Sequence, residues 1–212
     1  MAAELDNYRK AILGFDTVVR SADPSRWGDP SPCEGWAARD VVNHMIMMAD
    51  MVAGMANGKP AVVDEPEGYP APGVPDRVFR SELLAIVAGP LLGPDDDPAA
   101  VWATHCAALL EAVSDDAVLL AETMSPWGHT TTSDFLPMAG GDAVVHTWDL
   151  AVALGQEPVI DPELAEAAMR AWADAEASGS PIRQAAILGD PAVSNTTDPL
   201  EQLLAFTGRR LR

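Results

Sequence analysis

The sequence predicts an all-α protein, and three observations support this prediction. Apolar residues recur at steps of three and four along several segments, which is typical of the buried face of a helix. Proline and glycine stand at the borders of these segments, as at Pro98, Gly58 and Gly155. No segment shows the strict alternation of apolar and polar residues that indicates a half-buried strand. We therefore expect a helical bundle with crossover connections.

The first predicted helix has one apolar face and ends before Pro24, because a residue that precedes proline avoids helical dihedrals. The second is apolar around most of its circumference, which places it at the centre of the bundle. A long connection with five prolines follows at residues 58–76, and we expect irregular chain from Asp115 to Thr132. The predicted helices cover residues 4–20, 37–57, 76–87, 98–113, 134–155, 162–177 and 199–207.

Length and charge limit the classes of function. The 212 residues suit a single domain over 1–212 that buries a substantial core. Thirteen Lys and Arg against thirty-two Asp and Glu give a net charge of −19, which argues against nucleic acid and against anionic membranes. No apolar run approaches the roughly 20 residues of a membrane-spanning helix. With two cysteines and no secretory signal at the start, we expect a cytoplasmic protein without a disulfide framework.

Three residues on the central helices are candidate metal ligands. His44 belongs to the apolar second helix, and its stripe faces the core. Asp142 and His146 are four residues apart, so they share one face of a later helix and can reach one ion together. Burying three polar groups is costly unless they share a partner. Mutual hydrogen bonds would also satisfy them, so the residue pattern leaves both explanations open. Asp149, three residues beyond His146, either orients that ring or only packs the helix.

The other features near these residues each allow two interpretations. Gly140 and Gly141 indicate either close helix packing or space kept open beside Asp142. The methionines around His44 line an apolar binding surface or fill the core; they are Met45, Met47, Met48, Met51 and Met55.

We interpret the remaining histidines and cysteines as structural or solvent-exposed residues rather than as parts of a site. His105, Cys106 and His129 have no spacing that relates them to the central residues, and Cys33 lies in a loop with no evident base partner.

Two motifs resemble a known family. The segment from Trp27 through Pro32-Cys-Glu-Gly-Trp to His44 resembles the start of the mycothiol-dependent maleylpyruvate isomerase N-terminal family of the DinB-like superfamily. The segment Asp142-Ala-Val-Val-His146-Thr-Trp-Asp-Leu-Ala is similar to its acid-x-x-x-His-x-Trp-Asp-Leu-Ala signature. The close of the chain, residues 198–209, also resembles the actinobacterial metal-binding branch.

The resemblance implies a DinB-like four-helix bundle with a long crossover connection and additional C-terminal helices. It implies a divalent metal, zinc or nickel, held by His44, Asp142 and His146. The family commonly has Glu at the position of Asp142, whose carboxylate is one methylene shorter. The isomerases of the family carry a further C-terminal domain, so we do not expect maleylpyruvate itself as the substrate.

We therefore expect a thiol-dependent transferase or isomerase that acts on a small electrophilic molecule, with mycothiol as the candidate thiol. One alternative is a non-catalytic protein that binds metal or an apolar small molecule. Another is a metal-independent tailoring enzyme of secondary metabolism that uses the bundle cavity. The oligomeric state is open, with a homodimer as the default expectation.

Overall fold

The apolar segments fold into helices where their spacing predicts them. The structure is a computed structural model that describes residues 2–58, 92–114, 119–125, 128–180, 182–183 and 188–210. The described α-helices are α1 (Ala2–Arg20), α2 (Ala38–Ala56), α4 (Pro98–Ala112), α6 (Thr132–Leu154), α7 (Pro162–Ala177) and α8 (Pro199–Phe206). The all-α prediction is confirmed. The predicted helix 76–87 and all of the connection 58–76 except Gly58 lie outside the described residues.

Three of the described α-helices begin at an Asp-Pro pair, as does a short 3-10 helix at Pro24–Arg26. Asp97, Asp161 and Asp198 each accept a hydrogen bond from a backbone N–H of the first turn, namely that of Ala99, Glu163 and Glu201. The following proline occupies a position whose N–H would have no partner inside the helix, so its missing donor costs nothing there.

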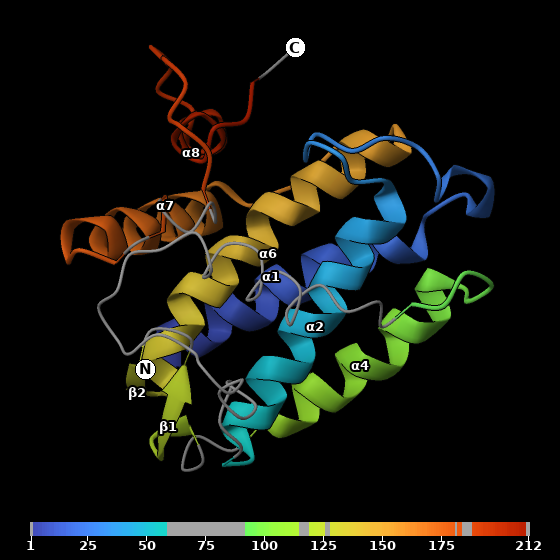
Figure 1. The fold of residues 1–212 in the computed structure, drawn as a ribbon. Coiled ribbons are helices and arrows are strands. Elements are labelled where there is room, and N and C mark those ends of the chain that lie inside the picture. Colours follow the sequence, from blue (N-terminus) through green and yellow to red (C-terminus); the bar gives the residue numbers. More distant parts are fainter. Residues whose placement is uncertain are drawn as a thin grey trace, which may run out of the picture.

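The bundle consists of four helices, α1, α2, α4 and α6. The α1 helix packs against α6, while α2 packs against both α4 and α6. Figure 1 shows this group, with α7 and α8 on the side of α6 that faces away from α4. The four-helix bundle with additional C-terminal helices is thus present. Because α6 has neighbours on both sides, it is buried around nearly its whole circumference.

The two adjacent glycines of α6 serve this packing. A Cβ added to Gly141 would lie 2.4 Å from Nε1 of Trp172 on α7. One added to Gly140 would lie 3.6 Å from the Cα atom of Tyr8 on α1. The glycines therefore sit against α1 and α7, which supports the packing interpretation.

One prediction about the segment before α6 is wrong. Where irregular chain was expected, β1 (Glu122–Ser125) pairs with β2 (Gly128–Thr131) as an antiparallel hairpin, with Glu122 opposite Thr131. Strands of four residues are too short for an alternating pattern to stand out in the sequence. The α6 helix also begins before the predicted Asp134, because the Thr131 hydroxyl caps it. Pro137 lies inside this helix.

Candidate metal centre

The three predicted ligands meet between α2 and α6. His44 Nε2 lies 3.1 Å from Asp142 Oδ2, and His146 Nε2 lies 3.4 Å from Asp142 Oδ1. One potential ligand atom from each of the three residues lies within 4.8 Å of the other two. The spacing of α6 places Asp142 and His146 together, whereas the packing of α2 on α6 brings His44 to them.

Burial and neighbouring charges shift the pKa values of the cluster residues in opposite directions. The side chain of His146 is 8% exposed, while those of His44 and Asp142 are 18% and 15% exposed. Burial by itself raises the pKa of Asp142, but the charges of His146 and His44 and their hydrogen bonds hold it well below its usual range. Burial lowers the pKa of His146, but Asp142 outweighs this effect and raises that pKa well above its usual value. Without metal, these charges therefore favour an ionised Asp142 carboxylate and a protonated His146 ring.

The donor set fits a divalent transition metal. Two imidazole nitrogens and one carboxylate oxygen suit zinc or nickel. The ring nitrogens of His44 and His146 lie 3.1 and 3.4 Å from the two oxygens of Asp142, so the three side chains would be the ones to hold such an ion. The shorter Asp142 side chain reaches both histidines directly. The same contacts also satisfy the three side chains as hydrogen bonds.

A second layer of polar residues lies behind His146. Its Nδ1 atom is 3.0 Å from Oδ2 of Asp149, which is fully buried. That carboxylate also contacts the guanidinium of Arg209 at 2.8 Å and the thiol of Cys33 at 3.2 Å. Cys33, His146 and Asp149 form the second group of residues whose donor atoms converge in the described chain.

Cys33 and Arg209 are residues of this layer that the sequence reasoning did not select. Cys33 was interpreted as having no base partner, yet its Sγ atom lies 4.0 Å from Nδ1 of His146. Its loop precedes α2 and turns at Gly35, whose φ of +80° favours glycine. Arg209 follows α8, far along the chain. Only the resemblance of the last residues to the family pointed toward it.

Trp36 covers the two histidines. Its ring stacks on that of His146 at a centroid distance of 6.0 Å and an angle of 16° between planes, and it lies 5.3 Å from the ring of His44. The backbone N–H of Trp36 donates to the carbonyl of Cys33 at 3.0 Å. The loop that holds Cys33 behind His146 therefore also holds Trp36 against the rings.

The other sequence candidates lie elsewhere. The Nδ1 atom of His105 on α4 is 2.5 Å from Asp50 of α2, and His129 is exposed on β2. Cys106 is buried in the core, where burial raises the pKa of its thiol to about 11. Among the methionines, Met45 and Met55 are buried core residues, Met48 and Met51 are partly buried against the core, and Met47 is half-buried. This distribution supports core filling.

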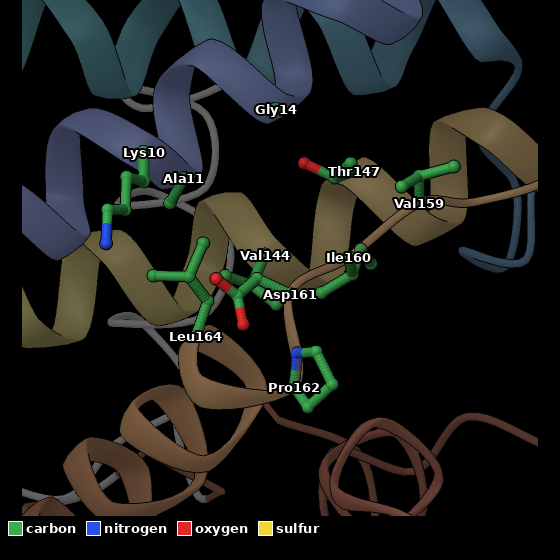
Figure 2. Close-up of a pocket in the computed structure, with 10 residues that line it drawn as sticks. All are labelled: Lys10, Ala11, Gly14, Val144, Thr147, Val159, Ile160, Asp161, Pro162 and Leu164. Atoms are coloured by element: carbon green, nitrogen blue, oxygen red, sulfur yellow. The ribbon is translucent and has the colours of Figure 1, made fainter.

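A separate cavity of about 440 Å³ lies between α1, α6 and the segment that leads into α7. Figure 2 shows Lys10 on α1, Val144 and Thr147 on α6, and Ile160 and Leu164 around it. None of the three predicted metal ligands lines this cavity. Its carboxylate, that of Asp161, caps α7. The side chains of α6 that could bind a metal therefore lie at its contact with α2, and not in this cavity.

No helix in the described part of the chain is long and apolar enough to cross a membrane.

Comparison with known proteins identifies similar sequences and similar solved structures. Two uncharacterized proteins of Mycobacterium tuberculosis, from strains CDC 1551 / Oshkosh and H37Rv, are each 24% identical over 210 residues, which is 97% of this chain and 97% of theirs. A crystal structure of a histidine-to-alanine mutant of the mycothiol-dependent maleylpyruvate isomerase matches 77% of this chain with a TM-score of 0.56 and 20% identity. A structure of that isomerase without this mutation matches 70% of this chain with a TM-score of 0.53 and 20% identity.

The matched region spans 65% and 60% of those two solved chains, less than two thirds of their length. At 20% identity, the likeness shows a shared fold. The model of the mycothiol maleylpyruvate isomerase N-terminal domain matches residues 8–151, which is more than half of the chain and includes His44, Asp142 and His146. The chain therefore belongs to the mycothiol maleylpyruvate isomerase N-terminal domain family.

Proposed function

We propose that this chain binds one divalent metal, zinc or nickel, through His44, Asp142 and His146 and uses a low-molecular-weight thiol in a transferase or isomerase reaction on a small electrophilic molecule. The observation that carries the proposal is the convergence of three donor atoms from two packed helices. Three protein ligands leave a coordination position for an exogenous group, which is the pattern of catalytic rather than structural zinc sites.

The thiol part of the proposal rests on the family and on the solved relatives, which are mycothiol-dependent isomerases. A metal at this position would lower the pKa of a bound thiol and so supply a nucleophile near neutral pH. The chain itself contributes the ligands, the buried Asp149 behind His146 and the ring of Trp36 over both histidines. We propose mycothiol as the thiol and a single domain over residues 1–212.

The first test is elemental analysis of purified protein after reconstitution with zinc or nickel. We expect about one ion per chain, and its loss in the His44→Ala, His146→Ala double variant. His105→Ala is the matched control, because it removes a histidine that also pairs with an aspartate, Asp50, but lies outside the site. Unchanged metal content in the double variant, or a folded protein that cannot be reconstituted, would refute the metal site.

The second test asks whether a thiol reaches the metal. Cobalt-substituted protein titrated with mycothiol should gain a near-ultraviolet absorption from thiolate-to-cobalt charge transfer. The experiment uses the Cys33→Ser background, so that the chain's own nearby thiol cannot produce that band. Stoichiometric cobalt without the new absorption would contradict the thiol-dependent reaction and favour a protein that holds metal without turnover.

A further inference from the structure

Three hydrogen-bond donors from separate parts of the chain converge on the buried carboxylate of Asp149. Its side chain has no exposed surface, and it accepts from three groups on separate parts of the chain. These are Nδ1 of His146 at 3.0 Å, the guanidinium of Arg209 at 2.8 and 3.3 Å, and the thiol of Cys33 at 3.2 Å. A buried carboxylate with three donors is satisfied and held in one orientation.

The position of Arg209 is set by the end of α8. The backbone N–H of Arg209 donates to the carbonyl of Leu204 at 2.7 Å, and that of Gly208 donates to the carbonyl of Ala205 at 3.1 Å. With φ of +86° at Gly208, these bonds form a Schellman motif that stops the helix and turns the chain. The guanidinium of Arg209 also donates to the carbonyl of Thr207 at 3.1 Å, so its direction is fixed by its own turn.

The two ring nitrogens of His146 face different carboxylates. Nε2 faces Asp142 at 3.4 Å, whereas Nδ1 faces Asp149 at the shorter distance of 3.0 Å. An ionised carboxylate only accepts hydrogen bonds, so the contact with Asp149 holds a proton on Nδ1. A neutral ring with its proton on Nδ1 presents the lone pair of Nε2 toward His44 and Asp142, which a metal requires.

We propose that Asp149 and Arg209 are positioning residues: Arg209, aimed by the Schellman turn after α8, fixes Asp149, and Asp149 holds His146 in the tautomer that binds metal through Nε2. This inference rests on the proposed function, because it takes the metal site as given. Arg209 lies outside the residues that the family model matches, 8–151. The segment after α8 would thus contribute to metal binding without touching the ion.

The arrangement also disfavours a second metal at Cys33, His146 and Asp149. The guanidinium of Arg209 lies 2.8 Å from Asp149 and 3.6 Å from Cys33, so a cation already faces these groups. We therefore expect one metal per chain. Two per chain, with one lost in Cys33→Ser, would overturn the assignment, because Asp149 would then be a ligand.

The test measures zinc affinity by competition with a chromophoric chelator. Loss of a residue behind a metal-bound histidine typically weakens affinity about 10- to 100-fold. We expect that range for Asp149→Asn and a smaller loss for Arg209→Gln, with partial recovery in Arg209→Lys. The double variant should be no weaker than Asp149→Asn alone, because Arg209 acts through Asp149.

Arg183→Gln is the matched control. Arg183 also holds the C-terminal segment, through the carbonyls of Gly189 and Phe206, but it is not among the contacts of the metal cluster. It should lower the thermal stability of the protein and leave zinc affinity unchanged. Equal effects of Arg183→Gln and Arg209→Gln on zinc affinity would show that both arginines only support the fold, and would overturn the proposal.

Nitrogen-15 spectra of the His146 ring give a readout that does not depend on metal. In metal-free protein, at a pH where the ring is neutral, we expect the proton on Nδ1 in the wild type and a shift toward Nε2 in Asp149→Asn. An unchanged tautomer would overturn the proposal. If the wild type binds no zinc, the proposed function fails, while this spectrum still decides what Asp149 does.

Discussion

The adjacent glycines of α6 allow a stability experiment in which two neighbouring substitutions have opposite expected signs. An alanine inside a helix is about 1 kcal/mol more favourable than a glycine, and this gain is common to Gly140→Ala and Gly141→Ala. The new methyl groups differ in what they meet. At residue 140 the nearest atoms of Tyr8 are 3.6 Å away, which is ordinary contact. At residue 141, Nε1 and Cδ1 of Trp172 lie at 2.4 and 2.9 Å.

The indole of Trp172 is 2% exposed, so it cannot swing into solvent to make room. Inserting a methyl group into such a packed contact typically costs about 1–3 kcal/mol. Because the helix-propensity gain cancels between the two variants, the difference between them reports this contact alone. We expect Gly141→Ala to be less stable than Gly140→Ala by about 1–3 kcal/mol, and each kcal/mol corresponds to roughly 2–4 °C in Tm for a chain of this size.

The assay is chemical and thermal unfolding of the metal-free proteins in the presence of a chelator. Gly14→Ala on α1 supplies the reference, because a Cβ there meets no atom within 4 Å and changes helix propensity alone. Gly140→Ala should match that reference. Equal stability of Gly141→Ala and Gly140→Ala would refute the reasoning that α7 rests directly on the backbone of α6.

Three further predictions concern the site. Burial raises the pKa of Asp149, but the hydrogen bond from His146 and the charges of His146 and Arg209 lower it from 3.8 to about 2. Protonation of Asp149 should therefore contribute about 2 kcal/mol to the unfolding free energy that the metal-free protein loses as pH falls from about 4 to 2, and Asp149→Asn should show a smaller total loss in acid denaturation. Asp142 raises the pKa of His146 well above its usual value despite burial, so zinc binding at neutral pH should release about one proton from this ring. Calorimetry in buffers of different ionisation enthalpy measures the number of protons released. If no proton is released, the ring is not protonated in the metal-free protein. A thiol reagent should label Cys33 in the folded protein and reach the buried Cys106 only after unfolding, and rapid labelling of both would contradict the packing of α4.

Local sequence patterns were sufficient to predict most of the described helices. The apolar stripe of the first segment and the proline after Asp97, Asp161 and Asp198 lie within one helix each, so their signal is complete in a short window. The β1–β2 hairpin was missed because its stabilising contacts are backbone bonds between two strands of four residues. The start of α6 was misplaced because its cap, Thr131, also ends β2.

The sequence by itself determined that Asp142 and His146 share a face of α6, because helical geometry alone places residues four apart together. It also selected His44, because a histidine on an apolar helix must face the core. Only the tertiary structure decided which groups surround them. His44 meets Asp142 through the packing of α2 on α6, and Arg209 and Cys33, which are 176 residues apart, meet at Asp149. Contacts between separate elements depend on how those elements pack, and no spacing along the chain carries that information.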